Sequence, residues 1–159
     1  MEWISKGKPS MLGGASGAIA GLVAITPACA VVGPLGAIIL GIVASIIAYW
    51  AVTSLKIALG YDDSLDVFGI HGVAGIVGAL GLAVLMSSQF GGTGYGDGMS
   101  MMSQLIVQAK SIGITVLWCG VISYVLFKII DATMGLRVSE EDERTGLDST
   151  SHGETAYRS

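Results

Sequence analysis

A single histidine, His71, lies inside a long uncharged and glycine-rich stretch of the sequence. An imidazole can accept and donate hydrogen bonds, and it can pass a proton from one partner to another. Polar groups cost free energy in hydrocarbon, so an isolated titratable residue in an apolar segment is a candidate functional residue. The residue types alone leave two interpretations open. His71 either takes part in chemistry or forms a structural hydrogen bond to a neighbouring helix.

Three carboxylates, those of Asp62, Asp63 and Asp66, come shortly before this histidine. Acidic residues at a helix N-terminus complement the helix dipole and typically stabilise the helix by about 0.3–1 kcal/mol each. Asp63 or Ser64 is positioned to cap the helix. The alternative role is attraction of cations, and Asp66 is the best candidate for it because it lies five residues before His71.

The composition indicates a membrane protein. Hydrophobic residues make up 52% of the chain and charged residues 13%, whereas soluble domains carry roughly 25% charged residues. The net charge of −4 is concentrated in an acidic C-terminal tail, and no basic patch suggests binding to nucleic acid. Cys29 and Cys119 stand alone in apolar runs, so the sequence predicts neither a metal site nor a cofactor.

Four apolar runs are long enough to cross a hydrocarbon core, which takes about 20 helical residues. We therefore expect an all-α polytopic membrane protein with a short segment, 1–10, before the spans and a polar tail, 132–159, after them. The predicted transmembrane helices cover residues 11–32, 35–57, 65–86 and 105–130.

Small residues are expected to let these helices pack closely. Gly13, Gly17 and Gly21 form a double GxxxG pattern in the first run, and Ala20 and Ala24 continue this small-residue surface. Thr26–Pro27 predicts a kink or an early stop near residues 25–27. Five further glycines recur at every third position in the third run and predict a broad small surface rather than a line, at Gly69, Gly72, Gly75, Gly78 and Gly81.

The distribution of basic residues predicts the orientation of the spans. With four spans, both termini lie on one side, and the loop at residues 56–65 lies there too. That side carries nearly all of the basic residues, whereas the opposite side carries only Lys110. Both ends of the chain are therefore expected to be cytoplasmic, and the helix of His71 runs from the cytoplasm outward.

The stretch SLDVFGIHGVAGIVGAL resembles the signature of the ammonium transporters of the Amt/Mep/Rh superfamily, in particular of their bacterial AmtB-like members. The first apolar run and the tail, GLRVSEEDERTGLDSTSHGETAY, resemble other parts of the same family. The resemblance implies a homotrimer in the cell inner (cytoplasmic) membrane. It also implies that this chain is the C-terminal portion only, with its four helices corresponding to the last four of an eleven-helix fold.

The same resemblance implies roles for residues around the histidine. His71 becomes the second of two facing pore histidines, whose partner is missing from this chain. Val67, one helical turn earlier, suits an apolar pore wall, and Phe68 is placed on the adjacent packing face. Asp66 is placed near the cytoplasmic mouth. The implied substrate is ammonium, which is deprotonated and conducted as ammonia.

The acidic tail has two interpretations. Its composition alone is compatible with a disordered solubilising segment. The resemblance instead implies a regulatory tail that meets a PII-type signal-transduction protein on the cytoplasmic side. The residues that match the family pattern are Gly135, Arg137, Glu140, Gly146, Leu147, Asp148, His152 and Gly153.

Two functional hypotheses follow from these observations. The first is that the chain is part of an ammonium transporter with a pore histidine and a regulatory tail. The alternative is a transport-incompetent membrane fragment that acts through its tail as a module for binding a PII protein. An enzyme is not indicated, because the sequence places no nucleophile or metal cluster beside the one membrane histidine.

Overall fold

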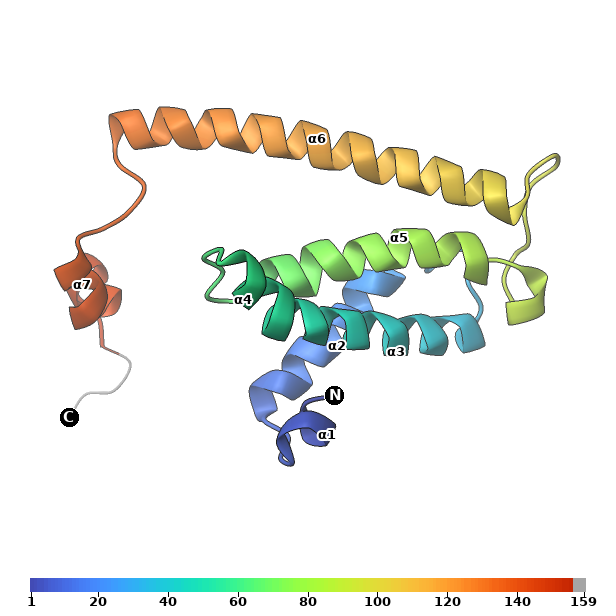
Figure 1. The fold of residues 1–159 in the computed structure, drawn as a ribbon, viewed down its shortest axis with the longest axis horizontal. Helices are drawn as coiled ribbons and strands as arrows, with labels where there is room; N and C mark the ends of the chain where they lie inside the picture. The colour runs from blue at the N-terminus through green and yellow to red at the C-terminus, as the bar shows by residue number, and fades with distance from the viewer. Residues whose placement is uncertain (156–159) are drawn as a thin grey trace. The chain divides into compact units, whose positions relative to one another are not determined.

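The computed structural model describes residues 1–155 of the chain. The described part is helical and contains no strand. It divides into two compact units, Met1–Ile114 and Thr115–Ser159. Figure 1 shows the order of the helices along the chain. This confirms the all-α class expected from the sequence.

The first apolar run forms a shorter helix than predicted. A short helix, α1 (Glu2–Lys6), precedes α2 (Met11–Ile25), whose N-cap is Ser10. The hydroxyl of Ser10 accepts a 2.9 Å hydrogen bond from the amide of Gly13. After Ile25 the chain continues as hydrogen-bonded turns to Val32. The predicted break near residues 25–27 is confirmed, whereas the continuation of the helix to residue 32 is wrong, because Pro27 has no N–H and disfavours helix at the residue before it.

Three helices of the described chain are long and apolar enough to cross a membrane, at Pro34–Leu59, Phe68–Leu85 and Met101–Thr133. The prediction of four spans is therefore confirmed for three of them. The remaining one, α2, has 15 residues, which is shorter than the length of about 20 that a crossing takes.

The helix Pro34–Leu59 closely follows the predicted span 35–57. It consists of α3 (Pro34–Trp50), the π-helical segment η1 (Ala51–Leu55) and α4 (Lys56–Leu59). Pro34 opens it, as expected for a residue whose missing N–H has no intrahelical partner at that position. Gly60 ends it with φ of 63°, a left-handed conformation that glycine adopts readily.

The helix that carries His71 begins later than predicted. It consists of the π-helical segment η2 (Phe68–Val73) and α5 (Ala74–Leu85), whereas the prediction was 65–86. Asp66 takes a left-handed backbone conformation with φ of 57°, so the helix cannot extend back through it.

The last span and the tail also differ from the predicted boundaries. Helix α6 (Met101–Thr133) extends beyond 105–130 at both ends and into the predicted tail. A 3-10 turn, η3 (Ser88–Phe90), lies in the loop before it. The tail contains α7 (Glu140–Thr145) and the π-helical turn η4 (Asp148–His152), which departs from the wholly disordered interpretation.

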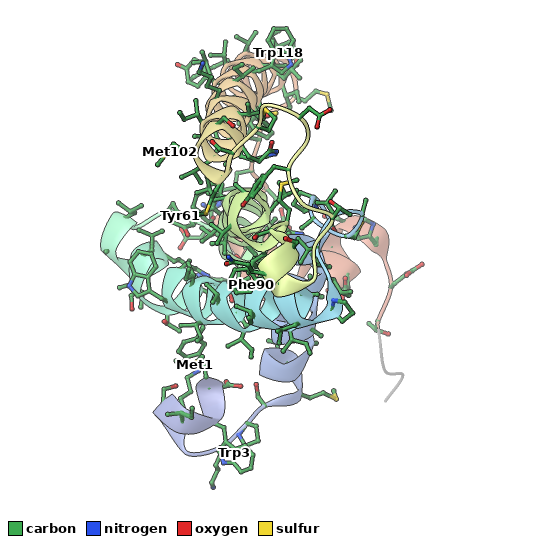
Figure 2. All side chains as sticks on the ribbon, turned by 90° about the vertical axis from the view of Figure 1, so that its right-hand side faces the viewer. Met1, Trp3, Tyr61, Phe90, Met102 and Trp118 are labelled. Carbon is green, nitrogen blue, oxygen red and sulfur yellow. The ribbon has the colours of Figure 1, made fainter. Side chains whose placement is uncertain are left out.

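The core of the first unit lies where α2, α3 and α5 pack against one another. Figure 1 shows α3 and α5 side by side and running in opposite directions, with α2 crossing them obliquely. Trp3, on α1, projects at the periphery of this unit (Figure 2). Small side chains dominate the buried set, which includes Ala20, Ala24, Ala28, Ala44, Ala48, Ala51, Ala74 and Ala83. Such residues allow helix backbones to approach closely.

The glycines of the His71 helix confirm the predicted broad packing surface. A Cβ atom at Gly78 would overlap the backbone carbonyl of Ala24 on α2. A Cβ atom at Gly81 would lie 2.5 Å from Leu40 Cδ1 on α3. The glycines therefore face two neighbouring helices rather than one.

The double GxxxG pattern of α2 behaves differently. A Cβ atom at Gly17 or Gly21 would meet no atom within 4 Å among the described residues. The residues of this surface that are buried are Ala20 and Ala24, which are 1% and 0% exposed. The predicted small-residue surface is therefore confirmed at Ala20 and Ala24, whereas Gly17 and Gly21 face open space within this part of the chain.

Candidate functional site

His71 lies in the first turns of its helix, inside the π-helical segment η2. Segments of this kind are rare and occur frequently at functional sites. The side chain is exposed, although the neighbouring Gly69 and Ile70 are buried against the rest of the unit. The imidazole of His71 has no hydrogen bond or ion pair to any residue between 1 and 155. The alternative of a histidine bonded to a neighbouring helix is therefore not realised in this part of the chain.

Val67 and Phe68 precede His71 by four and three residues and are exposed, as His71 is. Val67 is 50% exposed and Phe68 is 47% exposed. The ring of Phe68 meets that of Tyr61 edge to face, with 5.6 Å between their centroids. Three of the four residues expected in the pore are therefore exposed.

Asp66 makes different contacts from these three residues, although it directly precedes Val67 in the chain. Its Oδ1 lies 2.8 Å from Nζ of Lys56, at the end of the preceding helix. The same ammonium group donates a hydrogen bond to the backbone carbonyl of Asp63. A left-handed backbone costs a non-glycine residue roughly 1–2 kcal/mol, and Asp is among the residues that tolerate it best.

Asp63 is the residue that caps the helix. Its Oδ1 accepts a hydrogen bond from the amide of Val67 at 2.8 Å, and its Oδ2 accepts one from the amide of Phe68 at 2.9 Å. The hydroxyl of Ser64 turns instead toward Asp62. The sequence left Asp63 and Ser64 open as caps, and the geometry selects Asp63.

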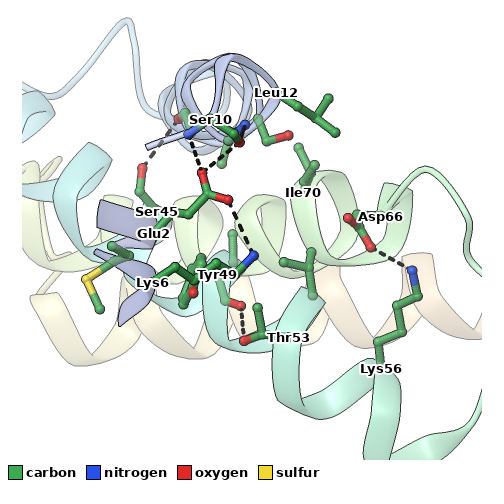
Figure 3. Close-up of a pocket in the computed structure, with 17 residues that line it drawn as sticks. Glu2, Lys6, Ser10, Leu12, Ser45, Tyr49, Thr53, Lys56, Asp66 and Ile70 are labelled. Atoms are coloured by element: carbon green, nitrogen blue, oxygen red, sulfur yellow. Dashed lines mark hydrogen bonds and ion pairs between the residues drawn. The ribbon is translucent and has the colours of Figure 1, made fainter. Parts of the chain in front are cut away.

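A cavity of about 370 Å³ lies between α1, α2 and α3, with Asp66 and Ile70 on its wall (Figure 3). Its polar lining includes Glu2, Ser10 and Tyr49 as well as Lys56. His71 is not among its lining residues. The four predicted pore residues are therefore divided between the exposed surface and this cavity.

Polar groups at the N-terminal end of the cavity satisfy one another. The carboxylate of Glu2 accepts hydrogen bonds from the amide of Ser10 at 3.0 Å and from its hydroxyl at 2.8 Å. These bonds, with a weaker contribution from Lys6, hold the pKa of Glu2 below its usual value. Ser5 and Tyr49 share a further hydrogen bond.

Sequence reasoning missed this cavity, because its lining comes from segments far apart in the chain. Two hydroxyl residues inside the second apolar run, Ser45 and Thr53, line it. They were the one available signal, but their partners are backbone carbonyls, that of Gly17 for Ser45 and that of Tyr49 for Thr53. No group of three potential metal ligands occurs in the described residues.

Two of the predicted tail residues, Arg137 and Glu140, form ion pairs with other residues of the tail. The guanidinium of Arg137 donates two hydrogen bonds to Glu143, with Nε–Oε1 and Nη2–Oε2 distances of 2.6 and 3.0 Å. These bonds lower the pKa of Glu143. Glu140 pairs with Arg144 at 2.6 Å, and Ser139 caps the short helix by accepting from the amide of Asp142.

The remaining tail residues lie at turns. Gly135, Gly146 and Gly153 have positive φ values of 82°, 103° and 66°. Leu147 directly precedes η4, which runs from Asp148 to His152. Residues 156–159, which end the predicted regulatory tail, lie outside the described residues.

Comparison with known proteins assigns the chain to a family. The model of the Ammonium Transporter Family matches residues 1–157. The ammonium transporter of Aquifex aeolicus is 46% identical over 98% of this chain and 36% of its own length. That of Bacillus subtilis is 42% identical over 99% of this chain and 39% of its own length.

The fold has a similar relative among solved structures. A chain titled "Sensor Amt Protein" superimposes with a TM-score of 0.83 at 26% identity, covering 94% of this chain and 36% of that chain. The present chain thus spans less than two fifths of the length of that structure and, at 36–39%, of the two curated relatives. The match to the family model along nearly the whole chain, together with these identities, shows that the chain belongs to the Ammonium Transporter Family.

Proposed function

We propose that this chain forms the C-terminal part of an ammonium transporter in the cytoplasmic membrane, with His71 in the pore. The family is one of transporters rather than enzymes, and the relatives described above are named ammonium transporters. The single observation that carries the role of His71 is the exposure of its imidazole in a π-helical segment, without a side-chain partner in residues 1–155. That exposure leaves the imidazole available to a pore completed by other helices.

The chemistry of the substrate favours such a residue. Moving an ammonium-sized cation into a low-dielectric medium costs on the order of 20 kcal/mol by a Born estimate. Neutral ammonia avoids most of this cost, so a narrow apolar pore favours deprotonation at its entrance. A neutral imidazole accepts a hydrogen bond from ammonia on one nitrogen and donates one from the other. Val67 and Phe68 supply an apolar surface beside it.

The experiment that tests this role is substitution of His71 in the assembled transporter. His71→Leu is expected to change the rate of ammonium flux or its ratio to methylammonium flux in proteoliposomes. Val84→Leu, on the same helix and 38% exposed, is the matched control for a change of an exposed side chain. Unchanged flux and unchanged selectivity in the His71→Leu protein would rule out the proposed role.

The assembly and orientation complete the proposal. The transporter is a homotrimer whose subunits each contain a pore, and both ends of this chain lie in the cytoplasm. Labelling of single cysteines introduced at Lys8 and at Asp97 with an impermeant reagent tests the orientation in intact cells. Lys8 is expected to be protected and Asp97 to react, and the reverse result would contradict the proposed topology.

A second candidate function is that the chain acts through its tail as a binding module for a PII-type protein and does not transport on its own. The paired contacts of Arg137 with Glu143 and of Glu140 with Arg144 favour it, because they give the tail local structure. Capture of a purified PII protein by the full chain, abolished by removal of residues 136–159, would support this function. Ammonium flux through liposomes that contain only the 159-residue chain would exclude it as the sole function.

A further inference from the structure

The connection between the second and third apolar runs ends in a residue with an uncommon backbone conformation. Asp66 has φ of 57°, a left-handed value that few residues other than glycine adopt. Such conformations persist where surrounding contacts hold them in place. The contacts made by Asp66 therefore show what fixes the start of the next helix.

Lys56 makes the contact that matters. Its Nζ lies 2.8 Å from Oδ1 of Asp66, and it also donates to the backbone carbonyl of Asp63. The amide of Asp66 donates to that same carbonyl at 3.2 Å and closes the turn. Because Lys56 belongs to the preceding helix, its ammonium group joins the end of one helix to the start of the next (Figure 3).

The turn that Lys56 holds also contains Asp63, the residue that caps the helix. The carboxylate of Asp63 accepts from the amides of Val67 and Phe68. The backbone carbonyl of Asp66 accepts from the amide of Ile70 at 3.0 Å. These bonds determine which residue begins the helix. A shift of one residue would rotate His71 by about 100° around the helix axis.

The π-helical segment makes this register matter for His71. A π-helical turn pairs residue i with i+5, whereas an α-helical turn pairs i with i+4. The inner side of the segment is constrained at Gly69, where a Cβ atom would lie 2.5 Å from Val52 Cγ1 on η1. The outer side, which carries His71, is exposed. The direction of the imidazole therefore depends on the anchor at the helix start.

We propose that Lys56 is a positioning residue for His71. It holds Asp66 in the left-handed conformation and Asp63 in the capping position, and thereby keeps the π-helical register that directs the imidazole outward. Its relevance to transport rests on the proposed function of His71, whereas the geometric link between the two residues does not.

The test uses the full chain in phospholipid nanodiscs. The readouts are the imidazole NMR signal of His71, assigned by its loss in His71→Gln, and the exchange rates of the Val67 and Phe68 amides. In Lys56→Met the His71 signal is expected to shift and the two amides to exchange about tenfold faster, as expected when a charge-assisted hydrogen bond that supports the cap is lost. Lys56→Arg is expected to restore both readouts, and Lys8→Met, which makes neither contact, should match the parent.

A second variant, Asp66→Asn, provides the test if Lys56→Met does not fold. Asp66→Asn keeps the size of the side chain and a residue that tolerates the left-handed backbone, but it removes the charge that Lys56 binds. It is expected to shift the His71 signal in the same way. A parent-like His71 signal in whichever of the two variants folds would overturn the proposal, even if the amides of Val67 and Phe68 exchange faster.

The outcome is separable from that of the transport hypothesis. If His71→Leu changes flux while the Lys56 variants leave the His71 signal unmoved, the positioning role is wrong and the pore role stands. If the Lys56 variants move the signal while His71→Leu leaves flux and selectivity unchanged, the positioning role stands and the pore role is wrong.

Discussion

Gly78 of α5 lies directly against the backbone carbonyl of Ala24 in α2, so closely that a Cβ atom at residue 78 would overlap that oxygen. Backbone has far less freedom to move away than a flexible side chain has. The contact therefore fixes the distance between the helix that carries His71 and α2. It also explains why the buried surface is built from glycine and alanine.

This contact predicts that Gly78→Ala destabilises the unit. The added methyl group must displace α2, and overpacking of this kind typically costs 1–3 kcal/mol, or about 2 kcal/mol here. Gly75→Ala is the matched control, because its nearest neighbour would be Val23 Cγ1 at an ordinary 3.8 Å. That variant is expected to keep or slightly raise stability, since alanine is the better helix former. Unfolding in mixed micelles measures both, and equal stabilities would contradict the assignment.

The cap at the start of the His71 helix gives a second prediction. Asp63→Ala removes both acceptors for the amides of Val67 and Phe68 and is expected to destabilise the helix start by about 1 kcal/mol. The measurement is the exchange rate of those two amides. Ser64→Ala is the control, because the hydroxyl of Ser64 turns toward Asp62 instead. A larger effect at Ser64 than at Asp63 would reverse the assignment of the cap.

The long apolar helices were predictable, because their length and hydropathy depend on local composition. The stop after Ile25 was also predictable, since Pro27 acts through its own backbone. The small surface on the His71 helix followed from the spacing of its glycines. In each case the signal lies in neighbouring residues and does not depend on how the helices are arranged.

Other features depend on contacts between distant segments, and the sequence could not show them. The left-handed conformation of Asp66 and its ion pair with Lys56 require the two helix ends to meet. The small-residue surface of α2 included both Ala20 and Gly17, and which of the two is buried depends on the rotation of α2 against α3 and α5. Asp66 lines the cavity, whereas His71 lies on the exposed surface. The two residues are only five positions apart in the sequence, so only the contacts with other helices separate them.

The ion pair between Arg137 and Glu143 predicts a pH dependence of the tail. Hydrogen bonds from the guanidinium lower the pKa of Glu143 from 4.5. A carboxylate with a lowered folded-state pKa stabilises the fold fully above its unfolded pKa, and this stabilisation is lost as the pH falls through the folded value. The local structure of α7 should therefore hold at neutral pH and weaken on acidification below about 4.5.

The carboxyl signal of Glu143 in NMR titrations of the full chain checks this prediction. It should titrate below 4.5 in the parent and move upward in Arg137→Gln, where the donors of both hydrogen bonds are removed. High salt should reduce the difference, because the Arg137 side chain is 71% exposed and that of Glu143 is partly exposed. A parent value at or above 4.5 would contradict the pairing.

Tyr95 gives a prediction for the loop that follows α5. Its hydroxyl donates a 2.8 Å hydrogen bond to the carbonyl of Ala83, which is fully buried near the end of that helix. Tyr95→Phe removes the donor and keeps the ring, so the carbonyl loses this partner at a cost of about 1 kcal/mol. The loop should then detach more often and be cut faster by a protease added to the full chain in nanodiscs. Gln89→Ala, in the same loop but away from this bond, should leave the cleavage rate unchanged. Equal cleavage of the Tyr95→Phe and parent chains would show that the hydrogen bond does not hold the loop.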